Sequence, residues 1–402
     1  MFQDRVLSGM RPTGAMHLGH YHGALKNWVR LQNEFPCLFF AADWHALTTH
    51  YEDPSVIEST VWEMFVDWLA AGIDPAKATL FIQSRVPQHA ELTMLLAFFT
   101  PLAWLERVPT YKDLVERHAE HGRDVLTYGF LGYPLMQAAD IMIYRANKVP
   151  VGEDQVSHIE LTREIARRFN HLFGREKGFE EKAEAAVKKM GPRKAKLYRT
   201  LRARYQEQGD EAALGEAQAL VEDVQNLSLG DKERLYGFIE GGGRMILAEA
   251  ESLLTDTPKL VGLDGQKMSK SYDNAIMLRE PPDSVTQKIR KMQTDPARVR
   301  RSDPGNPEAC PVWPLHKIYS SQDTRDWVWK GCTTAGIGCL ECKQPVIDAI
   351  LKEQAPMHER AQKYLDDPQL VRNIVADGCE RARKLAEETM GDVREAMGLK
   401  YT

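Results

Sequence analysis

Hydrophobic and polar positions along the first 172 residues follow the pattern of an α/β domain. Two short apolar runs, "CLFFAAD" at 37–43 and "TLFIQS" at 79–84, are typical of buried strands. Between them, "IESTVWEMFVDWLAAG" at 57–72 has apolar residues at helical spacing, and Gly72 is suited to end that helix. The strand–helix–strand order predicts a doubly wound α/β domain with a parallel sheet.

The remaining pattern divides the chain into four segments. Residues 1–173 hold the first α/β part, 174–248 have a helical composition, and 249–295 return to loop and strand signals. Residues 296–402 include a stretch rich in proline and cysteine and then have helical patterns to the end of the chain. We therefore expect an α/β domain that is interrupted by a helical insertion and followed by a helical domain.

The helical insertion separates its charges along the sequence. Eight basic residues and no acidic one lie between Lys188 and Arg204, whereas Tyr205–Val224 carries acidic residues and no basic one. This pattern predicts a solvent-facing helical hairpin whose halves attract each other. A basic arm that binds RNA is the alternative interpretation.

The composition is that of an ordinary globular protein, with 43% apolar and 27% charged residues among 402. The net charge of −5 means that a nucleic-acid partner would have to be met by a local basic patch. The N-terminal residues do not have the pattern of a signal peptide, and no apolar run has the length of a membrane span. We expect a cytoplasmic protein without a membrane partner.

A histidine motif follows the short apolar run Val6-Leu7 and precedes a segment of helical spacing. The stretch "RPTGAMHLGHYHGAL" contains His17, Gly19 and His20. A glycine at a helix start lets a flat ring or a phosphate approach the backbone, and the helix N-terminus supplies amide donors. The two imidazoles can donate hydrogen bonds to phosphate oxygens. The motif is a candidate nucleotide site, and helix-capping histidines are the alternative.

A second motif, "GQKMSKSYDN", supplies cations. Lys267 and Lys270 are three residues apart in a loop that also offers the hydroxyls of Ser269 and Ser271. Two mobile ammonium groups suit a triphosphate and the pyrophosphate that leaves it. Alone, this stretch could be a solvated surface turn, but the two motifs together in this order are highly specific.

With these two motifs the chain resembles the class I aminoacyl-tRNA synthetases, whose signatures are HIGH and KMSKS, and among them the bacterial tryptophanyl enzymes. The similarity extends to "AADWHALT", "GIDPAKATLFIQSRVPQHAEL", "YPLMQAADIMIY" and "VPVGEDQVSHIELTREIARRFN". It covers most of 5–172 and 255–295, is looser over the C-terminal helices, and gives no support to 174–248. It implies a Rossmann-like catalytic domain and a helical anticodon-binding domain over 296–402.

The resemblance also implies the reaction. ATP with Mg²⁺ would activate tryptophan to tryptophanyl-adenylate, pyrophosphate would leave, and the acyl group would pass to tRNA(Trp). Carried over by position, the catalytic residues would be His17, His20, Lys267 and Lys270. The residues implied in ATP binding are Arg11, Pro12, Thr13, Gly19, His20, Lys112, Gly152, Glu153, Asp154, Leu260, Lys267, Met268, Ser269, Lys270 and Ser271.

Tryptophanyl and tyrosyl enzymes share a fold, so side chains must distinguish them. Asp140 in "MQAADIM" can accept a hydrogen bond from an indole or a phenol, with a surface or capping aspartate as the alternative. In the tyrosyl enzymes a tyrosine just after the first strand contacts the phenol. Leu7 stands there in this chain and cannot hydrogen-bond, which favours tryptophan. The other residues implied in this pocket, with ordinary structural hydrogen bonding as the alternative for each, are His45, Tyr133, Gln137 and Gln155.

Four of the six cysteines lie close together in the sequence, with the spacing C-x21-C-x6-C-x2-C: Cys310, Cys332, Cys339 and Cys342. Four thiolates suit tetrahedral zinc or a [4Fe–4S] cluster. Because a subset of the bacterial tryptophanyl enzymes carries such cysteines on [4Fe–4S], the resemblance implies the cluster, with zinc or unligated thiols as alternatives. Cys37 and Cys379 are expected to be core or surface thiols.

Other classes of function remain as rivals. A different HxGH nucleotidylyltransferase would also bind ATP phosphates, but it would lack the KMSKS loop. A synthetase-like RNA-binding protein without catalysis is disfavoured because both histidines and both lysines are intact. A tyrosyl-tRNA synthetase is the nearest alternative. A homodimer is implied by the resemblance alone.

Overall fold

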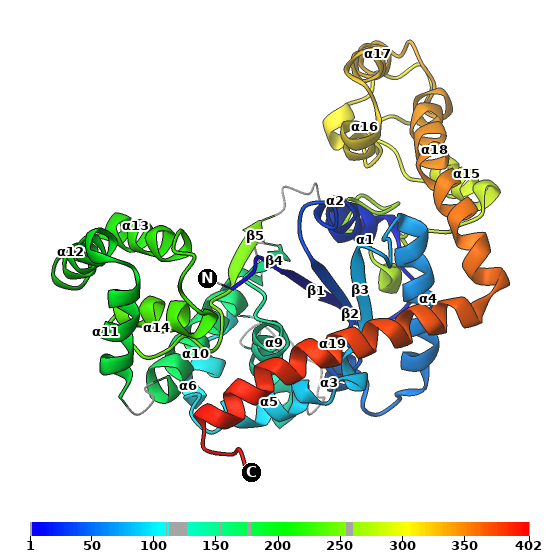
Figure 1. Cartoon of the computed structure of the whole chain (residues 1–402). Helices are drawn as coiled ribbons and strands as arrows, with labels where there is room; N and C mark the ends of the chain where they lie inside the picture. Colours follow the sequence, from blue (N-terminus) through cyan, green and yellow to red (C-terminus); the bar gives the residue numbers. More distant parts are fainter. Residues whose placement is uncertain are drawn as a thin grey trace. The chain divides into compact units, whose positions relative to one another are not determined.

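The protein is described by a computed structural model over residues 2–109, 111, 127–152, 155–174, 178–254 and 260–401. Five strands form one sheet in the order β3-β2-β1-β4-β5 (Figure 1). The pairs β1–β4 and β4–β5 are parallel. The strands are β1 Val6–Met10, β2 Cys37–Ala41, β3 Ala78–Ile82, β4 Lys148–Val151 and β5 Glu251–Leu254. The doubly wound α/β sheet predicted from the sequence is confirmed, because the chain returns past β1 to add β4 and β5 on its other side.

The local predictions in the first α/β part are also confirmed. All five residues of β2 are buried, as expected of a central apolar strand. Helix α4 runs over Ser55–Ala71 and buries most of its second half. Gly72 ends it with a φ of 113°, in the left-handed region that glycine adopts without strain.

The chain forms two compact units, and strands β1 and β3 pass from one to the other. The first unit comprises residues 1–8, 81–254 and 379–402, and the second comprises 9–80 and 255–378. Helices of the first unit are α5 Gln88–Ala97, α6 Leu102–Glu106, α8 Tyr128–Leu131, α9 Tyr133–Met142, α10 Val156–Phe173, α11 Phe179–Lys189, α12 Pro192–Gln208, α13 Glu211–Glu222 and α14 Leu229–Ile239, with a 3₁₀ turn over Gln83–Arg85.

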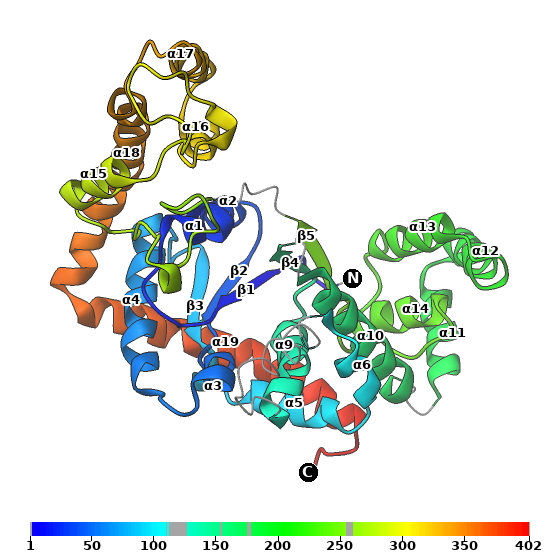
Figure 2. The ribbon, with the colours of Figure 1, turned by 180° about the vertical axis from the view of Figure 1, so that it is seen from behind.

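The first helix of the second unit begins at Leu18, after β1 and residues 11–17. The helices of this unit are α1 Leu18–His20, a π-helical turn over Tyr21–Leu25, α2 Lys26–Leu31, α3 Asp43–His50, α4, α15 Pro282–Lys291, α16 Trp313–Tyr319, α17 Gln322–Thr333 and α18 Cys339–Asp366, with 3₁₀ turns at Lys270–Tyr272 and Pro307–Ala309. Helix α19, Pro368–Ala396, crosses the boundary between the units. Figure 2 shows α15, α16 and α17 gathered around the first half of α18.

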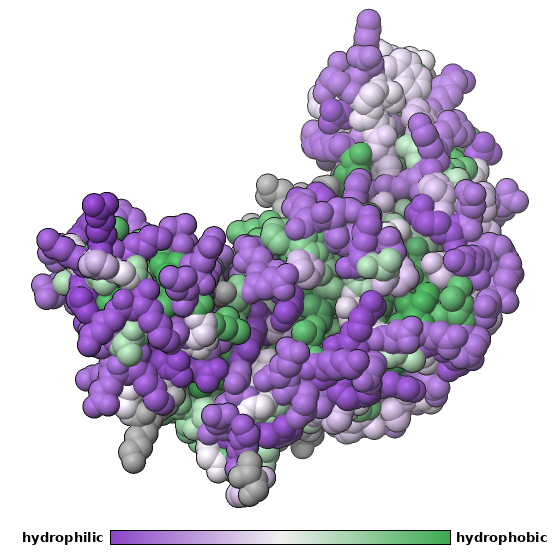
Figure 3. Space-filling model, viewed as in Figure 1, coloured by the Kyte–Doolittle hydropathy of each residue, from purple (hydrophilic) through white to green (hydrophobic). Residues whose placement is uncertain are grey.

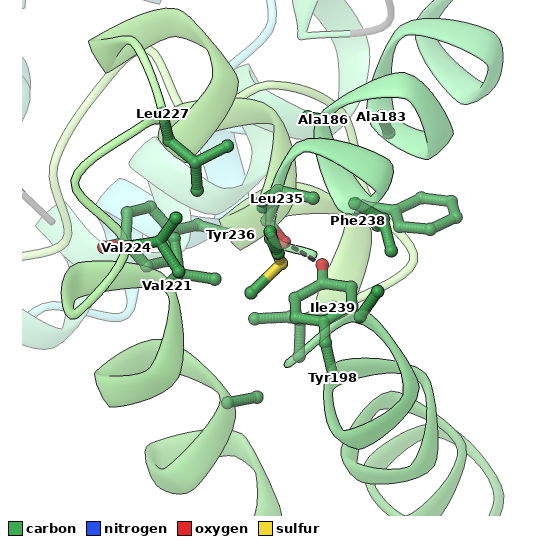
Figure 4. Packing of buried hydrophobic residues seen from close by; sticks show 14 of the residues in the cluster. Ala183, Ala186, Tyr198, Val221, Val224, Leu227, Leu235, Tyr236, Phe238 and Ile239 are labelled. Atoms are coloured by element: carbon green, nitrogen blue, oxygen red, sulfur yellow. Dashed lines mark hydrogen bonds between the residues drawn. The ribbon is translucent and has the colours of Figure 1, made fainter. Parts of the chain in front are cut away.

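The helical insertion has its own core inside the first unit. Helices α11 to α14 enclose apolar side chains that include Leu235, Ile239 and Tyr198, whose hydroxyl donates to the Leu235 carbonyl at 2.5 Å (Figure 4). The surface over these helices is mostly hydrophilic on the face in Figure 3. Helices α12 and α13 pack against each other as the predicted hairpin, turning at Gly209.

The two halves of that hairpin attract each other, as the charge pattern predicts. Lys194 pairs with Asp223 at 2.5 Å and Arg204 with Asp210 at 2.5 Å. Further bases pair with the flanking helices, Arg199 with Glu184 and Lys189 with Asp231. Much of the basic charge therefore neutralises the insertion's own acids, which weakens the RNA-arm alternative. Over the described residues, no helix is both long and apolar enough to span a bilayer.

Candidate active site

The histidine motif opens a helix next to the lysine loop, and both belong to the second unit. After β1 the chain runs through 11–17 and enters α1 at Leu18. The Leu18 N–H donates to the Ile276 carbonyl at 2.9 Å, and the Leu278 N–H donates to the Met16 carbonyl at 2.8 Å. These backbone bonds bring the residues that follow the KMSKS sequence against the histidine motif.

The two imidazoles of the motif are stacked. Their ring centroids lie 3.8 Å apart, and the backbone N–H of His17 donates to His20 Nδ1 at 3.2 Å. Because Nδ1 of His20 accepts, its proton is on Nε2, the only ring nitrogen that can donate to a ligand. A Cβ added at Gly19 would lie 2.9 Å from His17 Nδ1. Glycine is therefore required between the histidines to leave the first ring in place.

Both histidines are neutral near pH 7. Burial, and then the charge of Lys267, lowers the pKa of His17 to about 4, and this residue is only 7% exposed. The His20 pKa is lowered by desolvation first, and then by His17 and Lys267, although part of its ring remains exposed. Each ring thus offers one N–H donor, and the positive charge of the site comes from the lysines.

The lysine loop is held by a buried asparagine. Asn274 is 2% exposed, and its Oδ1 accepts from the Ser269 N–H at 2.7 Å. Its amide donates to the Lys267 carbonyl at 3.2 Å and to Asp264 Oδ1 at 2.8 Å. This brace fixes the backbone of the loop, whose Lys267 and Lys270 side chains are exposed.

The lysine side chains reach toward the histidine motif. A Cβ on Gly14 would lie 3.1 Å from Lys270 Nζ, and one on Gly19 would lie 3.5 Å from Met268 Cβ. Gly14 has a φ of 145°, so glycine is favoured there on conformational grounds as well. Two neutral N–H donors and two ammonium groups thus gather at one helix N-terminus, an arrangement suited to phosphates.

The neutral state of His17 makes stability depend on pH. The unfolded chain takes up a proton on this histidine below about pH 6.5, whereas the folded chain does so only near pH 4, so stability falls as the pH drops through that window. When the pH is lowered from 7.5 to 5, the free energy of unfolding should fall by about 2 kcal/mol less in His17→Gln than in the natural chain. Urea unfolding at the two pH values measures this. Equal losses in both proteins would contradict the buried, neutral His17.

Three of the residues assigned to tryptophan lie on one face of α9 in the first unit. Tyr133, Gln137 and Asp140 are spaced so that they share this face. The Gln137 Oε1 lies 2.6 Å from His158 Nδ1, and the Tyr133 ring contacts the same imidazole edge to face with centroids 6.3 Å apart. Asp140 is 1% exposed, which rules out the surface aspartate considered as its alternative.

Asp140 is the acceptor of a buried hydrogen-bond network. Gln83 Nε2 donates to its two carboxylate oxygens at 2.8 and 2.9 Å. His89 Nδ1 lies 2.6 Å from Asp140 Oδ1, and its Nε2 lies 2.7 Å from the Tyr144 hydroxyl. All four side chains are at most 1% exposed. Burial, together with the Asp140 charge, raises the pKa of Tyr144 well above its usual value, so its hydroxyl keeps its proton.

The remaining assigned residues are distributed over both units. Leu7 in β1 is 1% exposed, and the Gln155 N–H donates to the Gly152 carbonyl at 3.0 Å, both in the first unit. The second unit holds His45, which is 3% exposed, and the residues Arg11, Pro12, Thr13, Leu260 and Ser271. Lys112, Glu153 and Asp154 lie outside the described residues.

The four clustered cysteines lie around α17 and α18 in the second unit. Cys339 and Cys342 are one turn apart at the start of α18, Cys332 is in the last turn of α17, and Cys310 follows the 3₁₀ turn over 307–309. All six cysteines are free thiols. Within the described part of the chain, no group of three or more His, Cys, Asp or Glu side chains has metal-binding geometry. Cys37 and Cys379 are core thiols.

Sequence reasoning missed Gln83, His89 and Asn274. Gln83 and His89 stand in "FIQSRVPQHAEL", directly after the predicted strand at 79–84. Ligand-facing side chains are expected at the carboxyl end of a parallel strand, and this expectation alone would have indicated Gln83 as a candidate. Asn274 stands in the quoted lysine motif, but only the folded loop shows what it binds.

Comparison with known proteins places the chain in a family. The family described as "tRNA synthetases class I (W and Y)" matches residues 3–194 and 232–353, so the unmatched stretch 195–231 covers most of the α12–α13 hairpin. A tryptophan–tRNA ligase of Ralstonia nicotianae is 67% identical over the whole of both chains. One of Thermotoga maritima is 43% identical over 99% of this chain and all of that one.

The fold agrees with that placement. The structure of tryptophanyl-tRNA synthetase from Campylobacter jejuni, complexed with ADP and tryptophan, matches with a TM-score of 0.70 and 25% identity. The match covers 98% of this chain and 100% of that one. The chain therefore belongs to the class I tRNA synthetase family of the tryptophan and tyrosine enzymes, on its tryptophan–tRNA ligase branch.

Proposed function

We propose that this protein activates L-tryptophan with ATP, releases pyrophosphate, and transfers the tryptophanyl group to tRNA(Trp). The observation that carries this proposal is the contact between the histidine motif and the lysine loop. The residues just after the lysine loop are hydrogen-bonded through their backbone to the histidine motif, and Lys270 lies over Gly14, on a chain that is 67% identical to a tryptophan–tRNA ligase along its whole length. The same geometry supports phosphate binding at the start of α1.

The chemistry needs positioning and charge rather than a covalent intermediate on the protein. The tryptophan carboxylate attacks the α-phosphorus of ATP, and the bond to the bridging oxygen of pyrophosphate breaks. The N–H of His17 and of His20 would donate to phosphate oxygens, while Lys267 and Lys270 would neutralise the charge that grows on pyrophosphate. Mg²⁺ would enter with ATP on its phosphates. Arg11–Thr13, Gly152–Asp154 and Lys112 complete the proposed ATP site.

Tryptophan is the better candidate than tyrosine on the side chains that would surround the ring. Asp140 supplies a buried acceptor for the indole N–H, and Leu7, also buried, supplies no hydrogen bond that a phenol oxygen would need. Tyr133, Gln137, His45 and Gln155 complete the proposed pocket. A tyrosyl enzyme would leave the phenol oxygen without a donor at Leu7.

The electrostatics of the four clustered cysteines support the proposal of a bound cation among them. Burial, and then the charges of the other three cysteines, raises the pKa of Cys342 to about 12. Burial also raises the pKa of Cys310 and Cys332. Four thiolates so close together need a cation to stay ionised, and a bound metal supplies it. Polar groups also approach the sulfurs: the Arg298 guanidinium donates to Cys332 Sγ at 3.9 Å, and His316 Nε2 lies 3.4 Å from Cys342 Sγ.

We propose that these cysteines hold a [4Fe–4S] cluster, with zinc as the alternative. Protein purified without oxygen should be brown and contain about four irons per chain. Cys339→Ser should lose the iron, whereas Cys37→Ser, which changes a thiol of β2, should keep it. Colourless protein with one zinc per chain would support the alternative, and protein with neither metal would contradict the site.

The helical residues 296–402 would bind the anticodon region, and the chain would act as a cytoplasmic homodimer. Charging of tRNA(Trp) with labelled tryptophan tests the whole reaction. The expected result is ATP-dependent charging of this tRNA. A protein that binds tRNA but charges none would indicate the catalytically inactive rival.

A further inference from the structure

The amide of Gln83 makes hydrogen bonds through its nitrogen, whereas no described residue donates to its oxygen. It is completely buried, at the carboxyl end of β3 and in the first unit. Its Nε2 is within 2.8 and 2.9 Å of the two oxygens of Asp140. The amide cannot be turned around, because Oε1 would then face a carboxylate that offers only acceptors.

The other half of the amide, Oε1, is a buried acceptor that no described residue donates to. A buried acceptor without a donor is destabilising, and such groups in native proteins usually have a reason. Since Nε2 fixes the amide plane against Asp140, Oε1 is held in a set direction within the same buried region. The position after a parallel strand is one where ligands of doubly wound sheets bind.

Gln83 and His89 hold the Asp140 carboxylate as an acceptor. His89 must carry a proton on Nδ1, because this nitrogen lies 2.6 Å from Asp140 Oδ1. The Tyr144 hydroxyl, 2.7 Å from Nε2, can then donate to that nitrogen. Tyr144 therefore donates to His89, and His89 donates to Asp140. Gln83 is a second donor to Asp140 and comes from another element. Asp140 and Gln83 Oε1 together form a pair of fixed, adjacent acceptors.

We infer that Gln83 is a specificity-determining residue: its amide N–H groups hold Asp140, and its Oε1 accepts, beside Asp140, the hydrogen bond of the substrate's indole N–H. This inference rests on the proposed function, since it assumes that tryptophan binds at Asp140. An indole nitrogen only donates, so it satisfies an acceptor pair. A phenol oxygen also has lone pairs, which would face these acceptors without a donor.

The test compares two substrates that differ only at the indole nitrogen. Tryptophan and 3-benzothienyl-alanine, which has sulfur in place of the N–H, are assayed in ATP–pyrophosphate exchange with the natural chain and with Gln83→Met. The variant should raise the KM for tryptophan about tenfold, the effect of one lost buried hydrogen bond. Its KM for the sulfur analogue should change less than about twofold. Gln88→Met, the same substitution five residues along, should change neither.

A structural role alone would raise both KM values together, and that result would overturn the inference, as would an unchanged KM for tryptophan. If Gln83→Met does not fold, Gln83→Asn keeps the amide and shortens its reach, and the same difference between the two substrates is expected. A natural chain that fails to exchange pyrophosphate with tryptophan would instead contradict the proposed function, so the two failures are distinguishable.

Discussion

Lys270→Ala should lower the rate of adenylate formation by about 100-fold or more while changing tryptophan affinity little. The Lys270 ammonium lies over Gly14 at the histidine motif, and its charge is most useful when pyrophosphate separates from the α-phosphate. Removing one preorganised charge or donor at such a centre typically lowers kcat by two to three powers of ten. Single-turnover formation of the adenylate measures the rate, and tryptophan titration measures the affinity.

The control for this variant is Lys291→Ala, another exposed lysine of the same unit, at the end of α15. It should leave both quantities unchanged. Because the buried Asn274 braces the loop, Lys270→Ala should also melt at the same temperature as the natural chain. A loss confined to tryptophan affinity would remove Lys270 from the phosphate site.

Asp140→Ala should damage both stability and tryptophan recognition. Its carboxylate accepts from Gln83 and His89, and all three side chains are completely or almost completely buried. Removing it leaves these donors without an acceptor, which we expect to lower the free energy of unfolding by about 3 kcal/mol or more. The loss of an acceptor for the indole should raise the KM for tryptophan about tenfold or more.

Urea unfolding and pyrophosphate exchange measure the two effects separately. Asp377→Ala, an exposed aspartate in α19, is the matched control and should show neither. The KM for ATP should not change in the Asp140 variant. Retained stability would show that the network is not formed in solution, and an unchanged KM for tryptophan would show that Asp140 lies outside the pocket.

The sequence was sufficient for the sheet and for the phosphate motifs because both depend on local patterns. Apolar runs predicted β2 and β3, and helical spacing with Gly72 predicted the end of α4. The histidine and lysine motifs are recognisable because glycine, imidazole and ammonium groups are needed at fixed short spacings. The charge blocks also predicted the α12–α13 hairpin, since its ion pairs join residues of opposite blocks.

The buried partners could not be predicted, because they come from distant positions. Gln83 and Asp140 are 57 residues apart, and His89 and Asp140 are 51 apart. No periodic pattern indicates that a glutamine after one strand donates to an aspartate in a later helix. The tautomers of His20 and His89 likewise depend on a hydrogen-bond partner that only the fold provides.

The central claim is that this chain activates tryptophan, and ATP–pyrophosphate exchange driven by a single amino acid tests it most directly. Exchange should depend on tryptophan, should be lost with Lys270→Ala, and should be negligible with tyrosine at the same concentration. Exchange driven by tyrosine and not by tryptophan would contradict the selection of tryptophan that we assign to Leu7. The absence of exchange with either amino acid would contradict the enzyme function itself.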